Sequence, residues 1–219
     1  MSRPSLRVLS QLAHDLRSPI SVISSGLTEL YQETGLSAAD REQIAGLSQR
    51  AVKRLLSLSD RLSLAARLEQ PLEVLLQPLD LVPLTRDTLE QFVPGQLRHR
   101  VEVVTAFPQA PVRVRADRAL LAALLLELLT NANRFARREL RVGVSGGESA
   151  VVTVEDDGEG VKEDERAVLF EPFAERRSRT GLGMGLWLAR RLAEEHHGTL
   201  TVEPLSPGTR QRLTLPIQP

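Results

Sequence analysis

Two apolar stripes in the first 69 residues constrain the fold of this chain more than any other feature of its sequence. In each stripe apolar residues recur at steps of three and four, the spacing of one helix face. The first stripe comprises Leu9, Ala13, Leu16, Ile20, Ile23, Leu27 and Leu30, and the second comprises Ile44, Leu47, Ala51, Leu55, Leu58, Leu62 and Ala65. Thr34-Gly35 separates the stripes, and Ser37 or Asp40 can cap the second helix. The sequence therefore predicts a helical hairpin over residues 1–69.

A single hairpin of this kind has one apolar side and no further element to cover it. The economical solution is a homodimer, in which two hairpins bury their apolar sides in a four-helix bundle. We therefore predict a homodimer formed through the helical domain.

The composition changes at Gln70-Pro71, where prolines at positions 71, 78 and 83 indicate a linker or an edge strand. We predict a linker over 70–75 and a second domain over 76–219, with helices on one face of a largely antiparallel sheet. The fold class is thus α+β: a helical hairpin followed by an α/β sandwich. The expected helices of the second domain are 84–92, 117–135 and 182–195, and the expected strands are 100–106, 112–115, 140–145, 150–156, 199–203 and 210–215.

Composition excludes several classes of function. The chain has 28 basic and 28 acidic residues, so its charge gives no case for binding nucleic acid or an anionic membrane. It contains no cysteine, which excludes disulfides and thiolate metal sites and fits a reducing compartment, so we expect a cytoplasmic protein. The most apolar run, 119–129, is about half of the ~20 residues that a membrane span needs. The length leaves no room for a sensor domain, which an N-terminal region missing from this chain would supply.

Four short motifs carry possible chemistry, and each has an ordinary structural explanation as well. Gly181-Leu-Gly-Met-Gly185 opens a predicted helix, where bare backbone and free N–H groups suit a phosphate, although a plain glycine turn looks the same. Asp156-Asp-Gly-Glu-Gly160 ends a predicted strand and can hold a polar ligand edge or form a turn. Glu127 and Asn131 share one face of a buried helix, where a ligand, a metal or a structural network can satisfy them.

The fourth motif lies in the first helix. His14 sits just off the apolar stripe, so we expect it to face solvent, and an exposed histidine on a helix is most often an ordinary surface residue. Pro19 follows one turn later inside the same helix, where it removes a backbone donor. The other histidines, His99, His196 and His197, belong to no motif, and we predict structural or surface roles for them.

The joint order of these motifs resembles that of the sensor histidine kinases over nearly the whole chain. Ala13–Pro19 resembles the H box of that family, and Asn131-Ala132 with Arg134-Phe135 resembles its N box. Asp156–Gly160 resembles the first G box, Phe170–Phe173 the F box, and Gly181–Gly185 the second G box. The resemblance implies that the second domain is an ATP-binding domain of the type shared with gyrase and mismatch-repair ATPases.

The resemblance also implies roles for the site residues. Asp156 would accept a hydrogen bond from the adenine amino group, and Asn131 and Glu127 would hold Mg²⁺. Arg134 would reach a phosphate and Phe135 would pack near the base. The remaining nucleotide-binding positions implied are Gly158, Gly160, Arg177, Arg179, Thr180, Gly181, Gly183, Gly185 and Leu186, of which Arg177, Arg179 and Thr180 belong to a lid over 174–180.

The implied reaction is ATP-dependent phosphorylation of His14, with Asp15 holding the other ring nitrogen, followed by transfer to an aspartate of a response regulator receiver domain. Ser18 keeps a hydroxyl where relatives use a side chain in dephosphorylation, but it can also bond the carbonyl that Pro19 frees. The family commonly has Asn at position 127, where this chain has Glu127. Two alternatives to a kinase remain open. One is an ATPase in which Glu127 activates water, and the other is a nucleotide-binding scaffold without kinase activity.

Overall fold

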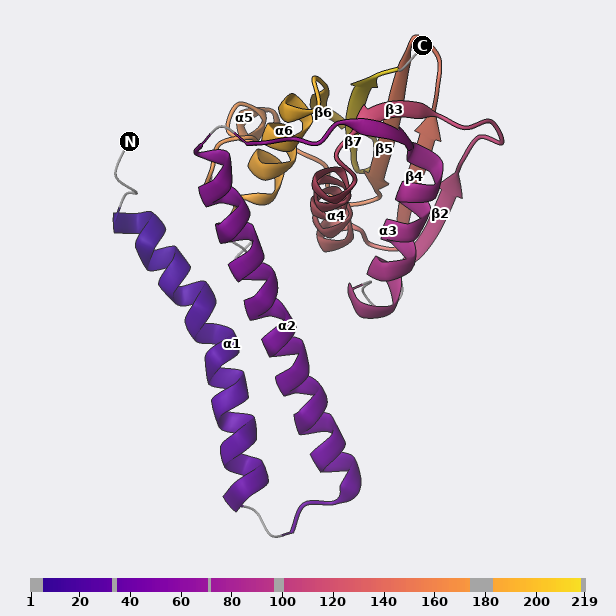
Figure 1. The fold of residues 1–219 in the computed structure, drawn as a ribbon. Helices are drawn as coiled ribbons and strands as arrows, with labels where there is room; N and C mark the ends of the chain where they lie inside the picture. The colour runs from indigo at the N-terminus through magenta and orange to yellow at the C-terminus, as the bar shows by residue number, and fades with distance from the viewer. Residues whose placement is uncertain (1–5, 33–34, 71, 97–100, 174–182, 218–219) are drawn as a thin grey trace. The chain divides into compact units, whose positions relative to one another are not determined.

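The computed structural model describes residues 6–32, 35–70, 72–96, 101–173 and 183–217 (Figure 1). Contacts divide the chain into two compact units. The described residues up to Glu69 belong to the first unit, and those from Gln70 onward belong to the second.

The first unit is the predicted helical hairpin. Helix α1 spans Leu6–Gln32 and continues through Pro19, and α2 spans Ala38–Leu68. A capping box fixes the start of α2: the backbone N–H of Asp40 donates to Ser37 Oγ at 3.1 Å, and that of Ser37 donates to Asp40 Oδ2 at 3.1 Å. Of the two caps that the sequence offered, Ser37 is therefore the N-cap and Asp40 its partner. Thr34 lies outside the described residues.

The apolar stripes are only partly covered within one hairpin. Ile44, Ala51 and Leu58 of α2 are buried against α1. Gly26 of α1 permits this close approach, since a Cβ there would lie 2.7 Å from Ser48 Oγ. In contrast, 52% of Ile20 and 59% of Leu27 remain exposed. The side chain of Leu9 lies outside the described residues.

The second unit contains a five-stranded sheet with the order β2-β4-β5-β7-β6. The β4–β5 and β6–β7 pairs are antiparallel, as expected for a largely antiparallel sheet, and β2 joins β4 in parallel. These strands are β2 Glu102–Ala106, β4 Glu139–Ser145, β5 Ser149–Asp156, β6 Thr199–Pro204 and β7 Thr209–Pro216. A separate antiparallel pair is formed by β1 Gln77–Asp80 and β3 Arg113–Ala116.

Helices cover one face of the five-stranded sheet (Figure 1). They are α3 Leu81–Gln96, α4 Arg118–Phe135 and α6 Gly185–Glu195, and a single-turn helix α5 spans Glu163–Arg166. Helix α4 packs on α3, α6 and β5, which explains why the sequence makes it apolar almost all round. The inward residues of β7, including Leu213 and Leu215, alternate with outward ones along the strand.

The main differences from the sequence-based expectation fall at α3, β1 and α6. Helix α3 spans Leu81–Gln96 rather than 84–92, because Pro83 falls in its first turn, where a missing N–H costs nothing. Pro78 belongs to β1, so the segment that the sequence left as a linker or an edge strand is a strand from Gln77. Helix α6 begins at Gly185 rather than at residue 182.

Candidate functional site

His14 and Asp15 form the polar feature of α1. The side chain of His14 is 69% exposed, as its place beside the apolar stripe predicted. Its Nδ1 lies 3.2 Å from Oδ1 of Asp15, whose side chain is buried. A carboxylate at this distance holds Nδ1 as the protonated nitrogen and leaves Nε2 of an exposed ring as the basic one. Ser18, one turn further along the same helix, is exposed as well.

Asp156 is the most unusual carboxyl group of the second unit. It ends β5 and is only 3% exposed. Its Oδ1 accepts a hydrogen bond from the backbone N–H of Gly158 at 2.9 Å, while Oδ2 has no partner among the described residues. Burial raises the pKa of Asp156 to about 6, against the lowering effect of the Gly158 N–H. A buried acceptor atom of this kind needs a hydrogen-bond donor, which a ligand or an ordered water can supply.

The loop after Asp156 passes close to the end of α4. A Cβ on Gly158 would lie 2.6 Å from both the Phe135 carbonyl oxygen and Asp156 Oδ1, so only glycine fits. Gly160 has a φ of +76°, which favours glycine on conformational grounds. The bare backbone beside Asp156 is therefore required by the packing of this loop against the end of α4.

Two polar side chains of α4 point toward neighbouring elements. Asn131 Nδ2 donates to Gln211 Oε1 at 3.0 Å, and Gln211 Nε2 donates to the Leu128 carbonyl at 3.1 Å. Asn131 Oδ1 accepts no hydrogen bond within the described part of the chain. Glu127 is buried, and a Cβ on Gly185 would lie 2.8 Å from its Oε2. The glycine that begins α6 thus meets the carboxylate that the sequence singled out.

The other sequence-predicted residues divide into two groups. Arg134 lies over the Phe135 ring, 5.5 Å from its centroid, at the end of α4. Gly183 has a φ of +64°, and Leu186 is buried in the first turn of α6. The positions outside the described residues are Arg177, Arg179, Thr180 and Gly181.

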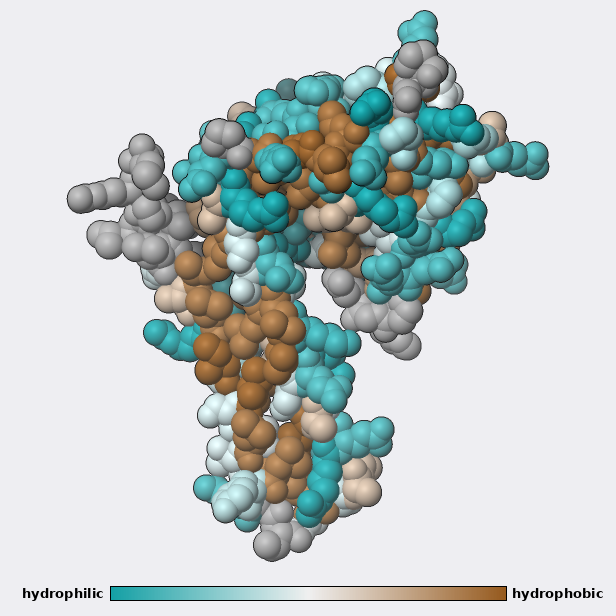
Figure 2. Space-filling view, in the orientation of Figure 1, coloured by the Kyte–Doolittle hydropathy of each residue, from teal (hydrophilic) through white to brown (hydrophobic). Residues whose placement is uncertain are grey.

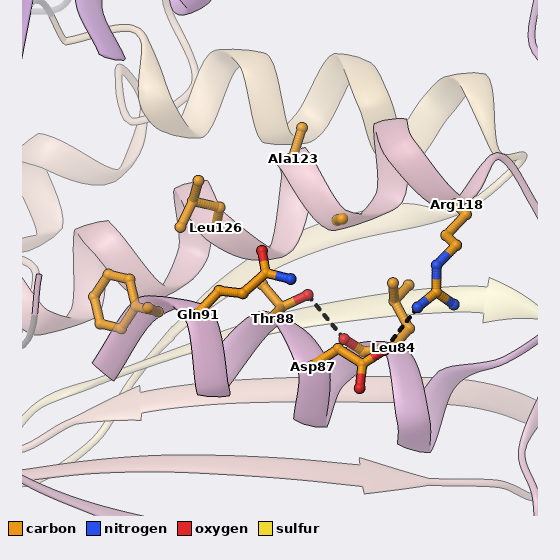
Figure 3. A pocket seen from close by; sticks show the side chains of 9 residues that line it. Leu84, Asp87, Thr88, Gln91, Arg118, Ala123 and Leu126 are labelled. Atoms are coloured by element: carbon orange, nitrogen blue, oxygen red, sulfur yellow. Dashed lines mark hydrogen bonds and ion pairs between the residues drawn. The ribbon is translucent and has the colours of Figure 1, made fainter. Parts of the chain in front are cut away.

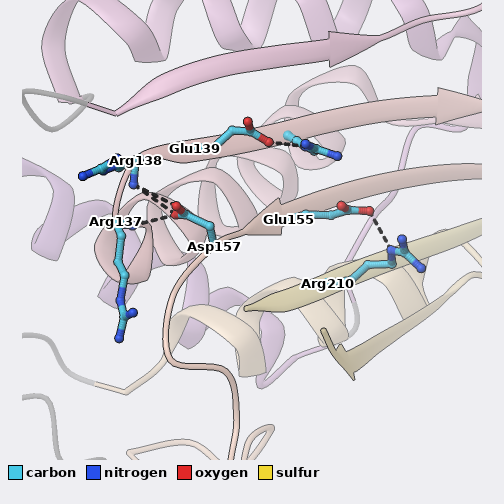
Figure 4. A network of polar contacts seen from close by, with 7 residues as sticks. Arg137, Arg138, Glu139, Glu155, Asp157 and Arg210 are labelled. Atoms are coloured by element: carbon cyan, nitrogen blue, oxygen red, sulfur yellow. Dashed lines mark hydrogen bonds and ion pairs between the residues drawn. The ribbon is translucent and has the colours of Figure 1, made fainter. Parts of the chain in front are cut away.

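Residues that the sequence did not single out complete this region (Figure 4). Asp157 accepts hydrogen bonds from the backbone N–H groups of Arg137, at 2.7 Å, and Arg138, at 3.1 Å, and so ties the end of α4 to the end of β5. Burial acts to raise the pKa of Asp157, but these N–H donors outweigh it and lower the pKa. Gly208 has a φ of +109°, and a Cβ there would lie 1.8 Å from the Asp156 carbonyl oxygen. In the sequence, the pair Pro207-Gly208 indicates a turn at this position. A turn motif does not reveal which residue the turn contacts.

A separate cavity of 380 Å³ lies between α3 and α4 (Figure 3). An ion pair of 2.7 Å between Arg118 and Asp87 lies at its rim. The small side chains of Ala122 and Ala123 account for the hollow. None of the site residues predicted from the sequence lines it, so the cavity is distinct from the region around Asp156.

Two kinds of feature are absent from the described residues. No group of three or more His, Cys, Asp or Glu side chains is placed to hold a metal ion. No helix within the described ranges has the length and apolarity that crossing a membrane requires.

Two family models match the chain. Residues 5–71 match the His Kinase A (phospho-acceptor) domain, and residues 116–219 match the histidine kinase-, DNA gyrase B-, and HSP90-like ATPase. The first match contains His14, and the second contains Glu127, Asn131 and Asp156.

Curated relatives are similar along almost the whole chain. The swarming motility regulation sensor protein RssA of Serratia marcescens is 33% identical over 205 residues, which are 90% of this chain and 43% of RssA. The sensor histidine kinase CpxA of Escherichia coli is 26% identical over 96% of this chain and 47% of its own length. The chain thus spans less than half the length of these relatives.

Solved structures share the fold. The Acinetobacter baumannii histidine kinase AdeS gives a TM-score of 0.70 at 20% identity, over 94% of this chain and 98% of AdeS. Full-length ShkA in complex with AMPPNP gives a TM-score of 0.67 at 28% identity, over 95% of this chain and 45% of ShkA.

Proposed function

This chain belongs to the sensor histidine kinases of two-component systems, and on that premise we propose that it binds ATP in its second unit and transfers the γ-phosphoryl group to His14. We assign residues 1–69 to dimerisation and histidine phosphotransfer, 70–75 to a linker, and 76–219 to ATP binding. The observation that carries the proposal is the buried Oδ2 of Asp156, which has no partner among the described residues and lies beside the bare backbone of Gly158.

The chemistry of adenine fits this feature. The exocyclic amino group of adenine is a donor, and Asp156 Oδ2 is an acceptor that otherwise remains unsatisfied in a buried place. Gly158 and Gly160 let the base lie against the backbone, and Phe135 offers an aromatic ring at the end of α4. ShkA, a relative in fold at 28% identity, is described in complex with the ATP analogue AMPPNP.

The phosphate end of the site would involve Asn131, Glu127 and the start of α6. Mg²⁺ prefers oxygen ligands and, when it is bound with a nucleotide, commonly takes only one or two of them from the protein. Asn131 fits that requirement because Gln211 holds its Nδ2 and leaves Oδ1 available. When bound, Mg²⁺ neutralises charge on the phosphates. Gly181, Gly183, Gly185, Leu186 and Arg134 would surround the phosphates, with Arg177, Arg179 and Thr180 contributing from the lid.

In the proposed transfer, the lone pair of His14 Nε2 forms a bond to the γ-phosphorus while the bond from that phosphorus to the bridging oxygen of ADP breaks. ADP leaves with the electron pair. Asp15 Oδ1, 3.2 Å from Nδ1, fixes the tautomer that exposes the basic Nε2 and stabilises the cation that forms. The phosphoryl group then passes to an aspartate of a response regulator receiver domain, and Ser18 is a candidate for orienting water during dephosphorylation.

We also propose that the first unit forms a homodimer. Apolar side chains gather along the α1–α2 hairpin in the space-filling view (Figure 2). The exposed large apolar residues of the two helices are Ile20, Val22, Leu27, Tyr31, Leu47, Val52 and Leu56, of which Ile20, Leu27 and Leu47 belong to the two apolar stripes. A second copy of the hairpin is the partner whose surface matches this one, because the same stripe is present on both copies.

The direct test is incubation with ATP labelled at the γ-phosphate. We expect acid-labile, base-stable label on the unmodified protein and none on His14→Gln, with ATP affinity nearly unchanged because the nucleotide is bound by the other unit. His197→Gln is the matched control, since this histidine is also exposed. Label that survives in His14→Gln would overturn the assignment.

One observation favours an ATPase as the second candidate. Glu127 is a buried carboxylate beside Gly185, where a base that activates water would sit. In the kinase, His14 is itself the nucleophile, so we expect Glu127→Gln to slow labelling of His14 while ATP affinity changes little. Fast ATP hydrolysis by His14→Ala, abolished by Glu127→Gln, would establish the ATPase instead. A protein that binds ATP without turnover or label would be a nucleotide-binding scaffold.

A further inference from the structure

His196 is a buried histidine that the proposed reaction does not use. It caps the C-terminus of α6 and is only 1% exposed. The backbone N–H of Asp117 donates to its Nε2 at 3.1 Å. Because Nε2 accepts, the ring proton is on Nδ1, which donates to the Leu192 carbonyl at 2.6 Å. Both ring nitrogens of a neutral imidazole are therefore used, and they join α6 to the start of α4.

Asp117 connects this junction to a third segment. It is the N-cap of α4, and its Oδ1 accepts from the backbone N–H groups of Ala119 and Leu120. Its Oδ2 accepts from the backbone N–H of Leu75 at 3.3 Å. Leu75 belongs to the stretch between α2 and β1, so the segment that joins the two units in sequence is bonded to the same residue as His196.

The junction and the phosphate end of the site lie at opposite ends of α6. Gly185 of α6 meets Glu127 of α4, whereas His196 of α6 meets Asp117 of α4, so the two helices run antiparallel. From Asp117 to Glu127 is about 15 Å along α4, and from Gly185 to His196 is about 16.5 Å along α6, at ~1.5 Å per residue. The two spacings agree closely. A slide of α6 along α4 would therefore break the hydrogen bond between His196 and Asp117 and at the same time displace Gly185 from Glu127.

We propose that His196 is a positioning residue for phosphoryl transfer: by bonding Asp117 it holds α6 in register on α4, and it relays the position of the Leu75 segment to the phosphate end of the nucleotide site. The proposal rests on the proposed function, because it is that site which His196 positions. Glu127 at one end and His196 at the other fix the register, and Asp117 brings the linker into the same hydrogen-bond network.

The kinetic test uses His196→Phe, which keeps a ring but removes both hydrogen bonds, and His196→Gln, which keeps one donor and one acceptor. His197→Gly is the control, because His197 is exposed and has a φ of +56°, which suits glycine. We expect His196→Phe to lower kcat for His14 labelling about tenfold or more per folded molecule, since small misplacements of reacting groups cost that much. His196→Gln should recover most of the rate, and His197→Gly should keep it.

The second arm follows the linker without using kinase activity. Hydrogen exchange of the backbone amides at 72–80 is measured with and without AMPPNP. We expect AMPPNP to slow this exchange in the unmodified protein and in Leu75→Ala, which keeps the backbone N–H at position 75. We expect no slowing in His196→Phe, or in Leu75→Pro, which lacks that N–H. An unchanged kcat in His196→Phe would overturn the positioning role, and an AMPPNP effect that survives in it would overturn the relay. Failure of the unmodified protein to label His14 would instead overturn the proposed function.

Discussion

At the scale of single residues, Asp156 combines burial, one unsatisfied oxygen and a raised pKa. In the folded protein its carboxyl group keeps a proton up to about pH 6, above its ordinary value of 3.8. Between these values the folded state binds more protons than the unfolded state, so ionisation of Asp156 lowers the stability of the free protein as pH rises. A donor on the ligand offsets that cost, because it satisfies the ionised carboxylate.

The first prediction follows from this linkage. The affinity for ADP should rise as pH increases through about 6, since the adenine amino group bonds better to the ionised Asp156. Asp156→Asn should weaken ADP binding by about 1.5–3 kcal/mol, the value of a hydrogen bond to a charged group, and should remove the pH dependence. Calorimetric titration between pH 5 and pH 8 would measure both effects.

Glu155→Gln is the control for this prediction. Glu155 precedes Asp156 in β5 but points to the other face of the sheet, where Arg210 binds it at 2.7 Å. Its substitution should leave the affinity for ADP unchanged. An Asp156→Asn variant with full affinity at every pH would move the adenine site elsewhere.

The second prediction concerns Gly208, where conformation and space both require glycine. Gly208→Ala would place a Cβ 1.8 Å from the Asp156 carbonyl oxygen at a φ of +109°. Backbone strain of this kind alone costs about 1–3 kcal/mol, and the overlap adds to it. We expect a clear fall in the thermal midpoint and weaker ADP binding. Gly147→Ala is the matched control, because nothing lies within 4 Å of its added Cβ; an equal effect of the two variants would refute the steric argument.

At the scale of elements, the start of α2 depends on a local capping box and not on packing in the core. Ser37 is exposed and has no role in the core, yet its Oγ satisfies an N–H of the first turn. Helix α1 has a different local feature. Pro19 lies inside it and leaves a backbone carbonyl without its usual donor. Local signals therefore explain where α2 begins, and the apolar stripe explains which side it buries.

The third prediction tests the cap. Ser37→Ala should lower the free energy of unfolding by about 1 kcal/mol, the usual cost of losing an N-cap. Urea titration followed by circular dichroism would measure it at fixed protein concentration. Ser57→Ala, at an exposed position in the middle of α2, should have no such effect, because alanine favours a helix interior. Equal midpoints for Ser37→Ala and the unmodified protein would show that the cap contributes nothing.

At the scale of the whole molecule, the exposed apolar side of the hairpin calls for a partner. The fourth prediction is that the protein is a dimer at micromolar concentration and that replacing Ile23 and Leu27 by serine yields a monomer with slower His14 labelling. Light scattering would report the mass. Val104→Ser, at an exposed apolar position on β2, should remain dimeric. A monomeric unmodified protein would contradict the proposed bundle.

The relation between sequence and structure differs between the two units. The helical hairpin and the order of the motifs could be predicted because periodicity and turn chemistry act over a few residues, as in the stripe of α2 and the cap at Ser37. The hairpins β4–β5 and β6–β7 were predictable for the same reason. Pro83 misled the prediction of α3, because a proline in the first turn of a helix resembles a helix breaker in sequence.

Sequence alone determined which residue types are present and on which element each lies: His14 beside Asp15, Glu127 with Asn131 on one helix, and Asp156 at a strand end. Only the tertiary structure decided which of them meet. Asn131 bonds Gln211 across 80 residues of sequence, and Asp117 bonds His196 across 79. Such contacts leave no local pattern, because they arise when the sheet and the α4–α6 pair close around a common core. The burial that leaves Asp156 Oδ2 without a partner results from the same closure, and no single segment of the chain encodes it.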